Sequence, residues 1–124
     1  MLHIELRNIA SMMVIAPLSA NTMAKMSNGI CDNLITNVFR CWPYQKAGGG
    51  WLLQKPVVVA PAMNTQMYEH PITEKQLHYL ESELSIQILG TETKTLMCNE
   101  TGSGAMASVD TIVLAIKEHI DNEF

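Results

Sequence analysis

The chain has 124 residues, of which 48% are hydrophobic and 16% charged, and its formal net charge is −4. This length and composition predict one folded domain with a real hydrophobic core. The negative charge provides no basic surface, which argues against nucleic acid as a partner. The apolar runs end well short of the ~20 residues that a membrane-spanning helix needs, so we expect no membrane association.

Cysteine usage and the first residues bear on the cellular compartment. Cys31, Cys41 and Cys98 are odd in number and form no C-x-x-C pair. This pattern favours reduced thiols in the cytoplasm over a disulfide framework, and together with four scattered histidines it predicts no metal site. The N-terminal sequence MLHIELRN lacks the apolar core of a signal peptide.

The predicted elements begin with two short apolar strands, MMVIAP at 12–17 and PVVVAP at 56–61. Continuous apolar runs of this length are typical of strands that are buried on both faces of a parallel sheet. Between them, residues 20–42 show helical spacing of apolar side chains, with a break or cap at Gly29. Residues 43–54 contain three glycines and read as a flexible surface loop.

The second half of the chain repeats the alternation of strand and helix. Thr73 and Gln76 predict a capping box for a helix that runs to about Ser82, and SIQIL at 85–89 is a third strand candidate. Ser108 is the expected cap of the last helix. The apolar stripe of that helix comprises Val109, Ile112, Val113, Ile116 and Ile120. Three strand–helix pairs predict an α/β fold with a parallel sheet and right-handed crossovers.

Two polar loops follow the predicted strands, at the edge where open parallel sheets bind ligands. The first, PLSANT, places Ser19, Ala20, Asn21 and Thr22 at a helix start, where backbone N–H groups and short polar side chains can hold a polar ligand edge. Helix capping alone would also explain these residue types. The interpretation of this loop therefore stays open between capping and ligand binding.

The second loop, PAMNTQM, delivers Asn64 to the same edge. An amide both donates and accepts hydrogen bonds, so it could bind a carboxylate without a counter-charge, or it could serve a tight turn. A third cluster, LMCNETGSGAMAS at 96–108, joins Cys98 to a glycine-rich stretch that could form a mobile flap, although a lone cysteine is more often a buried structural thiol.

PLSANT, PAMNTQMYEHPIT and MCNETGSGAMA, in this order, resemble the phosphopantothenoylcysteine decarboxylases, within the flavoprotein family of homo-oligomeric cysteine decarboxylases. LHIEL and GICDNLIT extend the similarity over nearly the whole chain outside 43–54. The resemblance implies a flavodoxin- or Rossmann-like three-layer fold. It also implies that residues 1–124 are the C-terminal portion of the flavoprotein domain, without the family's N-terminal strands and their flavin-phosphate loop.

The resemblance assigns roles to particular positions. Ser19, Ala20, Asn21 and Thr22 match the family's FMN-contacting stretch, and Ala62 matches a contact beside the isoalloxazine ring. The remaining matches are Asn64 and Met67, which correspond to residues that hold the substrate carboxylate, and His3 and Cys98, which correspond to the active-site histidine and the flap cysteine.

The implied activity is the FMN-dependent decarboxylation of phosphopantothenoylcysteine in coenzyme A biosynthesis, by a homotrimer with its sites at subunit interfaces. The flavin oxidises the substrate thiol to a thioaldehyde, loss of CO₂ gives an enethiolate, and the reduced flavin returns a hydride. His3 would help ionise the thiol and Cys98 would protonate the enethiolate. Tyr68 and Asn99 depart from the family's usual Trp and Gly. Two alternatives remain: a non-catalytic regulatory subunit like the halotolerance proteins, and a decarboxylase of peptidyl cysteine.

Overall fold

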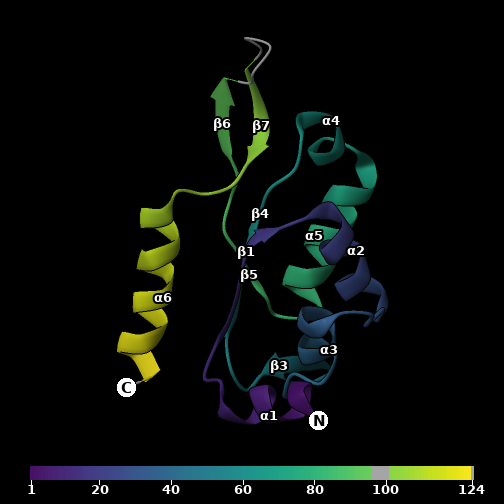
Figure 1. Ribbon diagram of the computed structural model, residues 1–124, viewed down its shortest axis with the longest axis vertical. Coiled ribbons are helices and arrows are strands. Elements are labelled where there is room, and N and C mark those ends of the chain that lie inside the picture. Colours follow the sequence, from purple (N-terminus) through teal and green to yellow (C-terminus); the bar gives the residue numbers. More distant parts are fainter. Residues whose placement is uncertain (96–100, 124) are drawn as a thin grey trace.

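The computed structural model describes residues 1–95 and 101–123. Its central feature is a parallel sheet in the order β1-β4-β5, with helices on both faces (Figure 1). The elements in chain order are α1 (Leu2–Ile9), β1 (Met13–Leu18), α2 (Ala20–Asn28), α3 (Leu34–Arg40), β2 (Tyr44–Ala47), β3 (Gly50–Leu53), β4 (Val57–Pro61), α4 (Thr65–Tyr68), α5 (Pro71–Ser82), β5 (Gln87–Ile88), β6 (Glu92–Thr95), β7 (Thr101–Ala105) and α6 (Val109–Glu123).

The predicted three-layer α/β fold is confirmed. Every residue of β4 is buried, because the strand lies between β1 and β5 and is covered on both faces. One core joins the sheet to α2, α3 and α5 and includes Met23, Phe39 and Leu80. A second core joins the opposite face to α6 through Ile112 and Ala115. Strands β1 and β4 are parallel neighbours, with Met13 opposite Val57 and Ile15 opposite Val59.

The predicted helix over 20–42 is two helices, and the break falls where the sequence placed it. Gly29 ends α2 in the left-handed conformation at φ 75°, which a residue without Cβ adopts at little cost. Asn33 then begins α3 with a capping box to Thr36. The predicted cap at Ser108 is confirmed, because the Thr111 N–H donates to Ser108 Oγ at 3.1 Å.

The predicted flexible loop at 43–54 was wrong. Strands β2 and β3 pair there in antiparallel register from Tyr44–Leu53 to Ala47–Gly50. Gly48 and Gly49 have φ of 63° and 131°, so they make the tight two-residue connection that a hairpin needs. The hairpin is tied to the body because the Tyr44 hydroxyl donates to the Leu84 carbonyl at 2.7 Å.

The predicted capping box at Thr73 and Gln76 was also wrong. Helix α5 begins earlier, with Pro71 at its first turn and His70 as the cap, whose Nδ1 accepts from the Ile72 N–H. Thr73 is buried, and its hydroxyl donates to the Met67 carbonyl. The third predicted strand is confirmed but shorter, since β5 covers only Gln87–Ile88 of the range 85–89.

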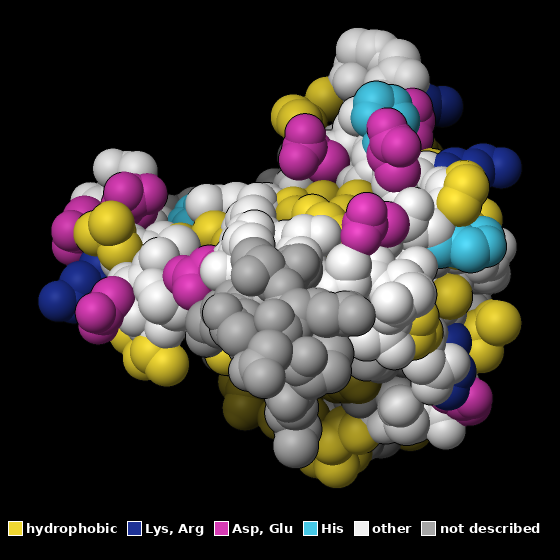
Figure 2. All heavy atoms as spheres, turned by 90° about the horizontal axis from the view of Figure 1, so that it is seen from above, with side chains coloured by type: hydrophobic (Ala, Val, Ile, Leu, Met, Phe, Trp, Pro, Cys, Tyr) yellow, Lys and Arg dark blue, Asp and Glu magenta, His cyan; other side chains and the backbone are white. Residues whose placement is uncertain are grey.

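Helix α6 covers the second face of the sheet and carries several exposed apolar side chains, among them Val109 and Leu114. In Figure 2 this helix forms a lobe on the left, with hydrophobic side chains at the surface between charged ones. No helix in the described parts of the chain is both long and apolar enough to cross a membrane.

Candidate functional site

The two polar loops lie side by side at the carboxyl edge of the sheet. Leu18, the last residue of β1, is in register with Pro61, the last residue of β4. The loop backbones are also joined, because the Ala62 N–H donates to the Leu18 carbonyl at 3.0 Å. The parallel pairing therefore brings the loops that begin at Ser19 and at Ala62 into one place, as the sequence predicted.

The loop after β1 is organised by a helix cap. Ser19 Oγ accepts from the Thr22 N–H at 3.1 Å and lies 3.2 Å from Thr22 Oγ1. The capping interpretation of Ser19 and Thr22 is thus confirmed, and it does not exclude ligand binding. Asn21 is exposed and Ala20 is half-buried, so both are accessible in the first turn of α2, just after β1 ends.

The loop after β4 is also organised by a cap. Asn64 is exposed, and its Oδ1 accepts from the Met67 N–H at 2.9 Å. This bond fixes which end of the amide is used for the cap, because only the oxygen can accept. The Nδ2 group, with its two N–H donors, makes no hydrogen bond to the described residues. A site of this kind can donate hydrogen bonds to a carboxylate.

A hollow of about 500 Å³ between α2 and the α4–α5 segment links the two loops. Ala20 lines it from the first loop and Met67, which is 46% exposed, lines it from the second. Its other walls are largely apolar and include Met23 and Ile72, with His70 as the ionisable group. Ala20, predicted to contact the flavin, and Met67, predicted to contact the substrate, therefore border the same hollow.

The hairpin of β6 and β7 stands at the same end of the molecule, next to α4 (Figure 1). The Met63 N–H donates to the Gly104 carbonyl at 2.9 Å, and Thr65 Oγ1 donates to the Ser103 carbonyl at 3.0 Å. The sequence did not single out Thr65, which makes the second of these bonds. The signal was its position directly after Asn64, with a hydroxyl free to reach another segment. Cys98 lies outside the described residues, as do all of residues 96–100 of the predicted flap at 96–108.

His3 lies at the opposite end of the sheet. It belongs to α1, a helix that sits at the amino edge of the sheet, far from α4 and the β6–β7 hairpin (Figure 1). The His3 carbonyl accepts from the Cys41 thiol at 3.7 Å, and Lys55 Nζ just before β4 donates to the Arg7 carbonyl at 2.6 Å. One copy of the chain therefore does not bring His3 together with Asn64.

Comparison with known proteins places this arrangement in a family. The family model described as "Flavoprotein" matches residues 1–121. The chain belongs to the Flavoprotein family. It is 47% identical over 116 residues to a soybean protein named phosphopantothenoylcysteine decarboxylase HAL3a, and 45% identical over 116 residues to the mouse phosphopantothenoylcysteine decarboxylase. Each match covers 94% of the chain and 50% or 52% of the relative, so the chain spans about half the length of these relatives.

Solved structures of similar proteins share the fold. A "PPC decarboxylase" mutant complexed with pantothenoylaminoethenethiol superposes with a TM-score of 0.85 at 42% identity, over 97% of the chain and 60% of that structure. "The FMN binding protein AtHal3" superposes with a TM-score of 0.78 at 45% identity, over 94% of the chain and 57% of that structure. These superpositions agree with the predicted flavodoxin-like architecture.

Proposed function

We propose that this chain carries the substrate-binding part of an FMN-dependent decarboxylase that acts on phosphopantothenoylcysteine in coenzyme A biosynthesis. The observation that carries the proposal is the exposed amide of Asn64, whose Oδ1 is occupied by the helix cap, in the loop that follows β4 next to the end of β1. The names of the soybean and mouse relatives support the choice of substrate. The thiols of Cys31 and Cys41, which are free, support a reducing compartment such as the cytoplasm.

The residues at the carboxyl edge fit a flavin. Ala62 is half-buried like Ala20, and Ala16 and Pro17 are exposed, so small or flat groups line the edge where β1 ends. Asn21 supplies hydrogen-bonding groups at the rim that suit the polar edge of an isoalloxazine ring. When bound, FMN would supply reversible two-electron oxidation of the substrate thiol, which creates the electron sink that carboxylate loss needs.

The described residues then have separate tasks. Asn64 would donate hydrogen bonds to the substrate carboxylate, and as a neutral group it would let CO₂ leave more readily than an arginine that stabilises the ground state. Met67, in the wall of the hollow, would contact the carboxylate end of the substrate beside Asn64, as the resemblance implies. Cys98 would protonate the enethiolate formed after CO₂ is lost, as the resemblance implies.

His3 would act as the base that helps ionise the substrate thiol. Because α1 and Asn64 lie at opposite ends of the sheet, His3 has to come from a second copy of the chain. A closed homotrimer, in which each site takes His3 from one subunit and Asn64 from the next, satisfies this requirement.

The test is the purified chain supplied with FMN and phosphopantothenoylcysteine. We expect a flavin absorbance band near one FMN per chain, a trimeric mass, and release of CO₂ with formation of the saturated thiol. The serine analogue of the substrate is the control, because its hydroxyl cannot form the thioaldehyde and it should release no CO₂. A flavin-loaded trimer that leaves phosphopantothenoylcysteine unchanged would contradict the proposal and favour a regulatory role.

A further inference from the structure

The hairpin of β6 and β7 is hydrogen-bonded to the loop after β4 through β7, and the Glu92 carboxylate of β6 accepts from the Ser108 N–H at 3.0 Å. The hairpin forms a separate sheet, and its strands do not pair with the parallel sheet. Two hydrogen bonds join it to the loop after β4, from the Met63 N–H to the Gly104 carbonyl and from Thr65 Oγ1 to the Ser103 carbonyl. We call these two bonds the β7 joint. Figure 1 shows β7 beside α4, where the joint lies.

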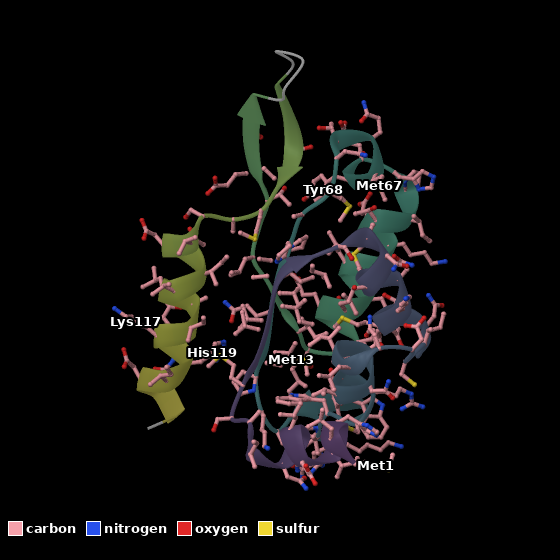
Figure 3. All side chains as sticks on the ribbon, viewed as in Figure 1. Met1, Met13, Met67, Tyr68, Lys117 and His119 are labelled. Atoms are coloured by element: carbon pink, nitrogen blue, oxygen red, sulfur yellow. The ribbon has the colours of Figure 1, made fainter. Side chains whose placement is uncertain are left out.

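Gly104 makes the close approach possible. A Cβ at this position would lie 2.5 Å from the Met63 carbonyl oxygen and 3.1 Å from Tyr68 Cβ. The Gly104 φ of 103° is also a conformation that residues with a Cβ rarely adopt. Tyr68 closes the joint from α4, on the side of that helix nearest β7 (Figure 3). Any side chain at 104 would therefore push β7 away from the loop.

The two bonds of the β7 joint are made by the residues directly before and directly after Asn64. Met63 is bonded to β7 on one side of Asn64, and Thr65 is bonded to it on the other. Asn64 itself is exposed, so core packing does not hold its side chain. Its orientation rests on the Met67 N–H and on the backbone that the joint fastens. Without the joint, a short four-residue helix would be the main support of this amide.

We propose that Thr65 and Gly104 are positioning residues, which fasten β7 to both sides of Asn64 and so hold its free amide ready for a substrate carboxylate. This inference rests on the proposed function for the role of Asn64. It adds that the hairpin and the carboxylate-binding loop form one unit. Loss of the Thr65 hydroxyl would leave the Ser103 carbonyl without this donor. The population of the state in which the loop is detached from β7 should then rise about five- to tenfold.

Amide hydrogen exchange on the purified chain tests the joint directly. In Thr65→Val, we expect the Met63 and Met67 amides to exchange about fivefold faster or more, while Thr65→Ser, which keeps the hydroxyl, restores slow exchange. Gly104→Ala should have the same effect through the clash with Met63. If Gly104→Ala does not fold, the exchange measurement on Thr65→Val alone still tests the joint.

Thr36→Val is the matched control. Thr36 is buried and its hydroxyl serves the capping box of α3, so its loss should cost stability but leave the Met63 and Met67 amides unchanged under folding conditions. In kinetics with phosphopantothenoylcysteine, Thr65→Val should raise KM more than it lowers kcat, and Thr36→Val should change neither.

The measurements distinguish a failure of the inference about the joint from a failure of the proposed function. A Met67 amide that exchanges at the wild-type rate in Thr65→Val, or equally fast in Thr36→Val, would overturn the inference, as would a wild-type KM in Thr65→Val. A wild-type chain that turns over no substrate would instead count against the proposed function. The exchange rates would still decide whether the joint holds Asn64.

Discussion

Asn64 has two hydrogen-bonding ends, and the fold uses one of them. Its oxygen caps α4 through the Met67 N–H, and its nitrogen stays available at the carboxyl edge of the sheet. Ser19 likewise caps α2, and the exposed Asn21 lies two residues further along the chain. For both loops the sequence left capping and ligand binding as alternatives. The structure confirms the cap in both loops, and under the proposed function the cap at Asn64 orients the amide toward the ligand.

Asn64→Asp should separate these two roles. Aspartate caps a helix about as well as asparagine, so we expect the free energy of unfolding to change by no more than ~0.5 kcal/mol. The outward N–H groups are replaced by carboxylate oxygen, which repels a substrate carboxylate, and KM should rise about ten- to hundredfold. Steady-state kinetics and thermal unfolding measure the two effects.

Asn33→Asp is the matched control, since Asn33 caps α3 through the Thr36 N–H away from the candidate site. It should leave KM unchanged. If Asn64→Asp binds substrate as well as the wild-type chain, Asn64 does not contact the carboxylate.

Tyr44 provides a prediction on pH. Burial, and to a lesser extent the neighbouring Tyr79, raises the pKa of Tyr44 above its ordinary value. The folded state therefore keeps the phenol protonated at pH values where the unfolded chain would ionise it. The contribution of the protonated Tyr44 to the free energy of unfolding is fully present below about pH 10. It is lost progressively as the pH rises above that value.

Tyr44→Phe should reduce this alkaline loss of stability and cost about 1 kcal/mol at pH 7, because the hydrogen bond to the Leu84 carbonyl is lost. Denaturant unfolding between pH 7 and 11 measures both quantities. Equal slopes of stability against pH above pH 10 in the two proteins would show that Tyr44 does not carry this dependence.

At the scale of elements, the buried strands and the long helices could be predicted from sequence. Apolar runs and helical stripes report burial directly, and β1, β4 and α6 lie close to where these patterns placed them. The β2–β3 hairpin could not be predicted from composition, because glycines in a loop and glycines in a tight turn look alike. The start of α5 was missed because His70, an uncommon cap, precedes Pro71.

Gly49→Ala should destabilise the chain by about 1 kcal/mol or more, since Gly49 has φ of 131° in the hairpin turn. Gly50→Ala is the matched control, because Gly50 has no positive φ and a Cβ there would meet nothing within 4 Å. Denaturant unfolding of both variants gives the comparison. Equal stability of the two would mean that the turn does not depend on the left-handed conformation.

At the scale of the whole molecule, strand direction separates the candidate residues. A residue that precedes a parallel strand lies at its amino edge, and a residue that follows one lies at its carboxyl edge. His3 precedes β1 and Asn64 follows β4, so the fold places them at opposite ends. Sequence resemblance put both residues in one site. Under the proposed function, a site that contains both residues would therefore take them from two copies of the chain.

The most direct test of this account is complementation between two impaired variants, His3→Asn and Asn64→Asp. At a substrate concentration below the wild-type KM, each alone should decarboxylate phosphopantothenoylcysteine at about a tenth of the wild-type rate or less. When they are unfolded, mixed in equal amounts and refolded with FMN, random trimers would contain intact sites at about a quarter of positions, and about a quarter of wild-type activity should return. A mixture as inactive as its components, beside a wild-type chain that regains activity after the same treatment, would contradict a site shared between copies.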